Sequence, residues 1–113
     1  THDNDTVNGW ITTMSRKDLA FTKKYLNVKR TTELCETLIR TALGSVADTA
    51  IIPMQDYLGL GGEARINTPS TLGGNWEWRM ERGACTEALS KHMLELAQIY
   101  GRIVPKSSRK KTK

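Results

Sequence analysis

The sequence predicts a piece of an α/β protein that contains helices, one buried strand and a long loop. Residues 34–43 carry an apolar stripe with helical spacing. Residues 49–53 are rich in β-branched side chains and do not alternate with polar ones, which is typical of a strand buried on both faces. A lone buried strand lacks partners for its backbone N–H and C=O groups. Either this strand pairs with something outside the chain, or the chain is part of a larger α/β protein.

The first predicted elements are a polar segment and a helix. Residues 1–14 hold a glycine and an Asn/Asp cluster, so we expect a loop or a strand-to-helix turn there. Ser15 is a suitable N-cap, with Asp18 three residues later, for a helix over about residues 16–27. The side chains expected on its inner side are Leu19, Phe21, Thr22, Tyr25 and Leu26.

The second helix follows a break at residues 29–31. Thr32 can cap this helix, and Gly44 is expected to end it. Its apolar stripe is the best periodic signal in the chain and consists of Leu34, Cys35, Leu38, Ile39, Ala42 and Leu43.

The strand is expected to end at Pro53, and residues 55–58 can form one helical turn. Residues 59–83 are rich in Gly, Asn, Pro, Ser and Thr, and a structureless run of this length is usually functional. Thr86 then caps a final helix over about residues 87–100, and Gly101 ends it.

The composition indicates at most one small domain. The 113 residues are 38% apolar and 26% charged, as in an ordinary soluble globular protein. No stretch approaches the ~18 apolar residues of a membrane span, and the N-terminal residues do not resemble a signal peptide. Cys35 and Cys85 are too few and too far apart for a disulfide framework or a zinc site. We therefore expect reduced thiols and a cytoplasmic location.

The net charge of +5 comes from the end of the chain. Residues 106–113 hold five of the 17 basic residues and no acid, which leaves 12 basic residues and 12 acids in residues 1–105. We expect residues 1–105 to form the folded segment and residues 106–113 to form a basic, disordered and solvated tail. A weak contact with a polyanion is the alternative for the tail; no specific nucleic acid is expected.

Polar and aromatic side chains gather in two places. The chain opens with His2-Asp3-Asn4-Asp5, and a metal site there would use His2, Asp3 and Asp5. In a strand, however, the two aspartates share one face while His2 points to the other. An Asp/Asn-rich turn is the competing interpretation.

The glycine-rich loop holds the other candidates. Trp76 and Trp78 share one face of an extended segment, either as core anchors or as a platform on which sugars or bases stack. Glu63, Arg65 and Asn67 either contact a ligand or order the loop through internal hydrogen bonds.

Two further titratable residues lie in the predicted helices. His92, in the last helix, is expected to be a surface or half-buried histidine. Cys35, in the apolar stripe, is expected to be a small core side chain.

Several motifs together resemble the C-terminal part of the 4-α-glucanotransferases, also called amylomaltases or disproportionating enzymes (glycoside hydrolase family 77). The resemblance covers residues 1 to about 100, in the order and spacing of that family. The motifs are Thr1-His2-Asp3-Asn4-Asp5-Thr6 with Gly9-Trp10, Ser45-Val46-Ala47, Pro53-Met54-Gln55-Asp56-Tyr57-Leu58-Gly59-Leu60-Gly61, Glu63-Ala64-Arg65-Ile66-Asn67-Thr68-Pro69, and Gly74-Asn75-Trp76-Glu77-Trp78-Arg79.

The resemblance implies a place in a (β/α)₈ TIM barrel, which needs about 250 residues. His2-Asp3 would stand at the end of strand seven, followed by helices, strand eight near Thr49–Pro53, the long loop and the last helix. The missing partners of the lone strand would then be strands seven and one of the complete barrel. As an isolated fragment, the chain would be mostly helical.

The resemblance also implies a retaining glycosyl transfer by an Asp nucleophile and a Glu acid/base, both upstream of this chain. Asp3 would be the third catalytic carboxylate, His2 would bind hydroxyls of the same sugar, and Asn67 would line neighbouring subsites. Asn75 and Trp76 would brace the loop. The chain departs from the usual pattern at Ser70, where glycine is common after the proline.

The implied partners are maltooligosaccharides or other α-1,4-glucans and the remainder of the barrel. No cofactor and no metal are implied, and the fragment alone is expected to be inactive. Two alternatives stay open: a non-catalytic helical binding module with a basic tail, and an enzyme that hydrolyses α-glucans.

Overall fold

The computed structural model describes residues 1–104, and the basic tail predicted over residues 106–113 lies outside the described residues. The described part is mostly helical, as expected, and contains no strand. Its α-helices are α1 (Val7–Thr13), α2 (Arg16–Leu26), α3 (Leu34–Leu43), α4 (Met54–Tyr57) and α5 (Glu87–Ile99), and its 3₁₀ turns span Thr31–Glu33 and Gly62–Ala64.

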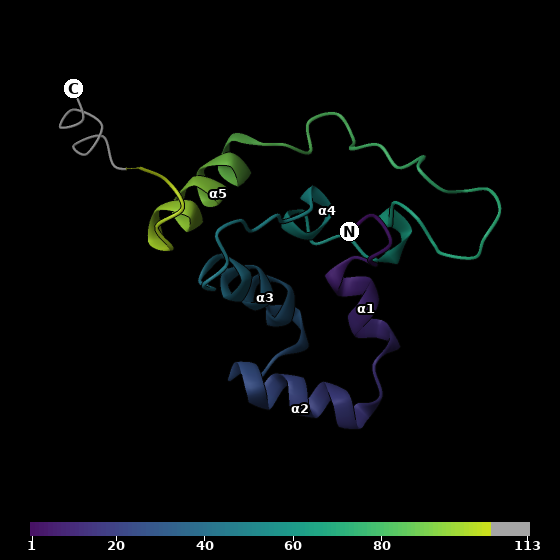
Figure 1. The fold of residues 1–113 in the computed structure, drawn as a ribbon, viewed down its shortest axis with the longest axis horizontal. Helices are drawn as coiled ribbons and strands as arrows, with labels where there is room; N and C mark the ends of the chain where they lie inside the picture. Colours follow the sequence, from purple (N-terminus) through teal and green to yellow (C-terminus); the bar gives the residue numbers. More distant parts are fainter. Residues whose placement is uncertain (105–113) are drawn as a thin grey trace.

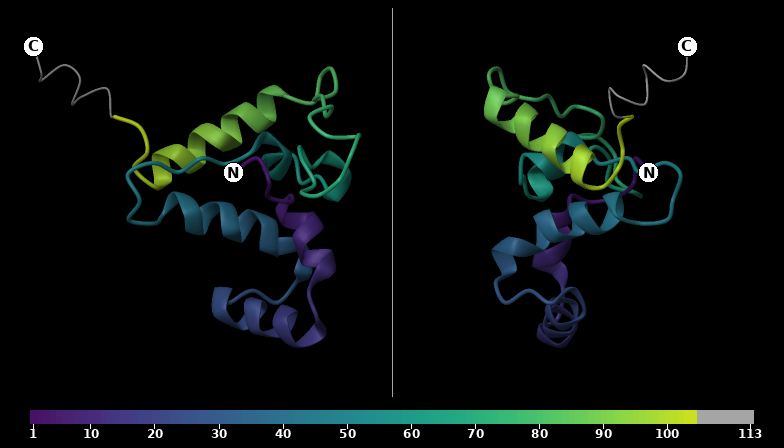
Figure 2. Two further views of the ribbon diagram at one scale, coloured as in Figure 1. Left: turned by 45° about the vertical axis from the view of Figure 1, so that its right-hand side comes forward. Right: turned by 90° about the vertical axis from the view of Figure 1, so that its left-hand side faces the viewer.

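The helices are stacked in an open arrangement (Figure 1). Both views of Figure 2 show α5 on one side, α3 and α1 in the middle and α2 on the opposite side. The stretch from the end of α3 to α4 runs between α3 and α5, and the long loop connects the N-terminal end of α5 with the turn beside α1. The Cα radius of gyration is 16.5 Å, against about 13 Å for a compact domain of this length. The helices therefore do not close around one large core.

Two of the predicted helix caps are confirmed and one is wrong. Ser15 accepts a hydrogen bond from the Asp18 amide at the start of α2, and Thr86 accepts one from the Leu89 amide at the start of α5. Thr32 caps nothing, because residues 31–33 form a 3₁₀ turn that leads into α3. The single helical turn predicted at residues 55–58 is present as α4.

Helix α1 corrects the expectation of a loop or a strand-to-helix turn over residues 1–14. Thr6 caps the helix by accepting the Gly9 amide at 3.0 Å. The Val7 amide donates to Asp56 Oδ1 at 2.8 Å, from 49 positions along the chain. A carboxylate at a helix N-terminus satisfies a free amide and complements the helix dipole. Asp56 is distant in the sequence, so the local composition of residues 1–14 gave no sign of this helix and predicted a loop.

The strand predicted over residues 49–53 does not form within residues 1–104, where these residues have no strand to pair with. Ile51 among them is 84% exposed, so the segment is not buried on both faces in the described part of the chain. The stretch before them is held by a side chain instead of a ladder. The Arg102 guanidinium donates to the carbonyl oxygens of Leu43 at 2.9 Å and Ala47 at 2.9 Å.

The core confirms the periodic stripe of α3. Cys35, Ile39 and Leu43 pack with Leu96 of α5, and partly buried Ile52 and Tyr100 lie against them. The inner side predicted for α2 is wrong at its aromatic residues. Phe21 and Tyr25 are 66% and 76% exposed and stack on each other with ring centroids 6.2 Å apart.

Helix α5 ends where it was predicted to end. Gly101 follows its C-cap with φ of +68°, the left-handed conformation that favours glycine after a helix. Among residues 1–104, no helix is long and apolar enough to cross a membrane.

Candidate functional site

The structure brings together the three residues that sequence analysis singled out, although Asn67 is 64 positions from Asp3. The Asn67 amide Nδ2 donates to Asp3 Oδ1 at 2.8 Å. The His2 Nε2 lies 3.1 Å from the same oxygen. The His2 and Asp3 side chains are about half exposed, at 56% and 49%, so both can reach a ligand in solvent. An amide and an imidazole thus orient one carboxylate at the surface.

The Asp5 carboxylate lies against the backbone at the start of α1. Asp5 Oδ1 accepts the Thr6 amide at 2.7 Å. A Cβ atom at Gly9 would collide with the Asp5 carboxyl group, so a larger residue there would push this carboxylate out of its present position. Asp5 therefore faces its own helix and does not point to His2 as a third metal ligand would.

A metal centre made of His2, Asp3 and Asp5 finds no support in this geometry. Across the described part of the chain, no three His, Cys, Asp or Glu side chains gather in a way that could hold a metal ion.

Arg65 joins the loop to the start of the chain. Its guanidinium donates to the backbone oxygens of Asp3 and Asn67 at 2.7 and 2.8 Å. Glu63 accepts the Gly61 amide at 3.0 Å. These bonds agree with the interpretation that Glu63, Arg65 and Asn67 order the loop through internal hydrogen bonds, whereas the bond from Arg65 to Asp3 was not predicted.

Trp76 contacts the site but is not a core anchor, which was one of the two interpretations offered for it. Its ring lies 5.0 Å from the His2 ring, at an interplanar angle of 41°, and the residue is 58% exposed. Its backbone has φ of +61° and its amide donates to the Ile66 oxygen at 2.7 Å. Trp78, by contrast, is half-buried. Trp76 therefore ties the end of the loop to the site.

Asn75 braces the loop as expected. Its Oδ1 accepts the Thr68 amide at 2.8 Å, and its Nδ2 donates to the Thr71 hydroxyl at 3.0 Å. These bonds close the loop on itself and fix the backbone that follows Asn67.

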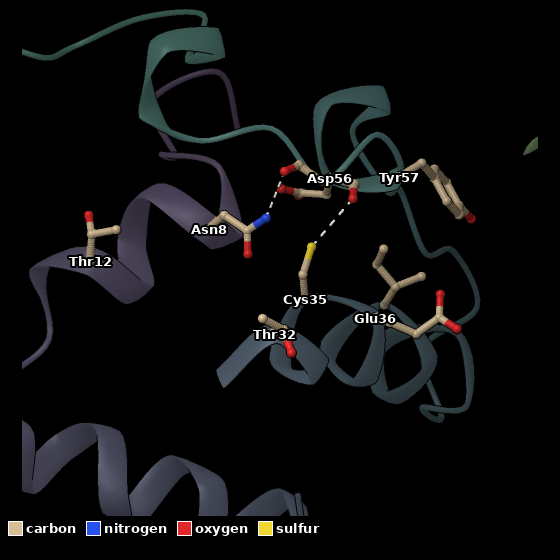
Figure 3. Close-up of a pocket in the computed structure, with 9 residues that line it drawn as sticks. Asn8, Thr12, Thr32, Cys35, Glu36, Asp56 and Tyr57 are labelled. Carbon is tan, nitrogen blue, oxygen red and sulfur yellow. Dashed lines mark hydrogen bonds between the residues drawn. The ribbon is translucent and has the colours of Figure 1, made fainter. Parts of the chain in front are cut away.

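A hollow of about 540 Å³ lies away from this site. Figure 3 shows it between α1, α3 and α4. Its polar groups are largely engaged with each other: the Asn8 amide donates to the Gly59 oxygen at 2.8 Å, and the Cys35 thiol donates to the Asp56 oxygen at 3.3 Å. The residues that line it are Asn8, Thr12, Thr32, Cys35, Glu36, Ile39, Asp56, Tyr57 and Gly59.

Burial perturbs two groups around that hollow. Burial, with the negative charges of Asp56 and Glu36, raises the pKa of the Cys35 thiol to about 11. The thiol is therefore inert near neutral pH, which agrees with its prediction as a core side chain. Burial and the charge of Asp5 also raise the pKa of Asp56, against the hydrogen bond from Val7.

His92 is half-buried, as predicted, and joins α5 to α3. Its Nε2 lies 2.7 Å from Glu36 Oε1, while Arg40 donates to Glu36 Oε2 at 3.3 Å. Burial opposes ionisation of Glu36, but the hydrogen bond and charge of His92, and then those of Arg40, outweigh it and lower the pKa of Glu36. This cluster connects α5 to α3 and so serves helix docking.

Comparisons with known proteins give a consistent result. A family model described as 4-alpha-glucanotransferase matches residues 1–86. A chloroplastic/amyloplastic 4-alpha-glucanotransferase of Arabidopsis thaliana is 42% identical over 106 residues, which cover 91% of this chain and 18% of that protein. A 4-alpha-glucanotransferase of Clostridium butyricum is 44% identical over 103 residues, which cover 90% of this chain and 21% of that protein.

A solved structure also matches. The amylomaltase of Streptococcus agalactiae, determined in complex with acarbose, superimposes with a TM-score of 0.83 at 36% identity, over 89% of this chain and 20% of that chain. The chain thus spans about a fifth of the length of the relatives it matches.

Proposed function

Because this chain belongs to the family of 4-alpha-glucanotransferases, we propose that it is part of an enzyme that moves a segment of an α-1,4-glucan to the 4-hydroxyl of another glucan or of glucose. The reaction is a retaining one. A carboxylate nucleophile forms a glycosyl intermediate, and an acid/base group first protonates the leaving oxygen and then activates the acceptor. This chain contributes a third carboxylate.

The observation that carries the proposal is the convergence of Asn67 and His2 on Asp3 Oδ1, at 2.8 and 3.1 Å. Within residues 1–104 both contacts use the same oxygen, so Oδ2 is left to accept hydrogen bonds from sugar hydroxyls. The negative charge of Asp3 stabilises the oxocarbenium-like transition state, which is more positive than the bound sugar. His2 binds the same sugar, and Asn67 also reaches the neighbouring subsite.

The nucleophile and the acid/base belong to the remainder of a (β/α)₈ barrel. Residues 49–53 serve as its eighth strand, and two features of the chain support this. Residues 49–52 form no backbone–backbone hydrogen bond within residues 1–104, and the apolar Ile51 is 84% exposed. Neighbouring barrel strands would satisfy the backbone and cover the side chain.

The complex of the related amylomaltase with acarbose supports α-glucans as substrates of the proposed enzyme. A cytoplasmic location is also part of the proposal, although the plant relatives are chloroplastic or amyloplastic proteins.

The direct experiment is incubation of the complete protein with maltotriose, followed by chromatography of the products. The proposal predicts glucose together with glucans longer than maltotriose, because the glycosyl intermediate is passed to another sugar. The 113-residue chain alone should give neither product, because it lacks the nucleophile and the acid/base. Products limited to glucose and maltose would instead establish hydrolysis, and turnover by the fragment, free of host enzymes, would contradict the division of the active site.

A further inference from the structure

We propose that Arg65 is a positioning residue, which sets the geometry between Asp3 and Asn67 and thereby aims the Asp3 carboxylate at the sugar. The inference rests on the function proposed above and deepens it.

The Arg65 side chain bridges two segments that are far apart in the sequence. Its Nη2 donates to the backbone oxygen of Asp3 at 2.7 Å, and its Nε donates to the backbone oxygen of Asn67 at 2.8 Å. The side chains of these same two residues then meet at 2.8 Å. One rigid guanidinium plane therefore holds both backbones at the separation that the Asn67–Asp3 bond needs.

The Arg65 bridge matters because backbone hydrogen bonds do not join the two segments. Among residues 1–104, no backbone hydrogen bond joins residues 1–5 to residues 62–69. The position of the His2-Asp3 segment over the loop is set by side chains, chiefly the Arg65 guanidinium and the Asn67 amide. Loss of the guanidinium would let the Asp3 backbone shift relative to Asn67.

The surroundings orient the guanidinium. Its Nη1 lies 3.9 Å from Asp5 Oδ2, and the Arg65 and Asp5 side chains are only 25% and 21% exposed. Asp5 is itself fixed by the Thr6 amide at 2.7 Å. Arginine suits this place because its donors have a fixed planar geometry, whereas a lysine ammonium cannot donate from the Nε position.

The test uses the complete enzyme and the substitution Arg65→Lys, which keeps the charge but not the bridge. The matched control is Arg16→Lys, an exposed arginine in the first turn of α2. With maltotriose as substrate, we expect kcat of the Arg65→Lys enzyme to fall on the order of 10-fold to 100-fold, because displacements near 1 Å at a reacting centre have effects of this size. The KM should change less than about threefold, and the control should match the wild type.

Two further readouts separate positioning from simple stabilisation. Added guanidinium ion should restore part of the kcat of an Arg65→Ala enzyme, because it can fill the vacated space and make the same bonds. In the double variant, Arg65→Lys should add little to the loss caused by Asp3→Asn, since Arg65 acts through Asp3.

The opposite results overturn the inference. These are an Arg65→Lys enzyme with wild-type kcat, losses that multiply in the double variant, or a loss of activity that follows the loss of folded protein. The last result would make Arg65 a stabilising residue only. If the wild-type protein forms no transfer products from maltotriose, the proposed function itself fails before any variant is compared, and the role of Arg65 fails with it.

Discussion

Ser70, which follows Pro69 in the long loop, has its backbone in the left-handed region with φ of +64°. The change to test is Ser70→Gly. A residue with a Cβ atom loses about 1–2 kcal/mol in that conformation, and glycine does not. Glycine loses more chain entropy on folding, by roughly 0.5–1 kcal/mol. The two effects leave a net gain of about 0.5–1 kcal/mol for glycine.

Hydrogen exchange in the complete protein measures this gain at the loop itself. The Trp76 amide is a suitable probe because its bond to Ile66, at 2.7 Å, must break when the loop opens. A gain of about 0.5–1 kcal/mol makes the open loop rarer and slows hydrogen exchange at the Trp76 amide by about two- to fivefold.

The control for this prediction is Gly73→Ala, at φ of +81°. No atom lies within 4 Å of the Cβ that alanine would add, so no steric clash contributes. That variant should exchange about two- to fivefold faster, because a strain of about 1–2 kcal/mol is partly offset by the roughly 0.5–1 kcal/mol of chain entropy that alanine saves. Faster exchange in Ser70→Gly than in the wild type would refute the strain argument at Ser70.

Three other predictions concern the helical part. Leu96 of α5 is fully buried against α3, so Leu96→Ala should destabilise the docking of α5 by about 2–5 kcal/mol; unchanged exchange protection in α5 would contradict this. At pH 8, iodoacetamide should label exposed Cys85 and spare buried Cys35, whose pKa is raised to about 11; mass spectrometry would reveal equal labelling if the reasoning fails. Glu36→Gln should lower stability by less than ~1 kcal/mol, because the Glu36–His92 pair is partly exposed. The lowered pKa of Glu36 means that its contribution is present above the ordinary carboxyl pKa and is lost as pH falls through the lowered value. A difference from wild type that persists in acid would be inconsistent with this origin.

Elements with local determinants were predictable from the sequence. Ser15 and Thr86 cap helices with amides three residues away, and the α3 stripe buries the side chains that its period selects. Helix α1 was not predictable, because its N-terminus depends on Asp56, which is distant in the sequence. The segment at residues 49–53 resembled a strand in composition, but within residues 1–104 it has no neighbouring strand with which to pair.

The site shows the same division. The motif resemblance indicated the family, which is confirmed, and selected Asp3, His2 and Asn67, which the structure brings together. The roles of these residues in catalysis stay predictions. The bridge made by Arg65 was not predictable, because its acceptors are backbone oxygens, and carbonyl groups leave no signature in the side-chain sequence.

The most direct measurement of the central claim is the steady-state kinetics of Asp3→Asn in the complete enzyme with maltotriose. The variant keeps the size of the side chain and removes its charge. If Asp3 stabilises a positive transition state, kcat falls on the order of 10²-fold or more and KM changes much less. His2→Ala should lower kcat less, and Asn67→Ala should mainly raise the KM for the acceptor. A near-normal kcat for Asp3→Asn would contradict the account and leave His2-Asp3 as a structural turn.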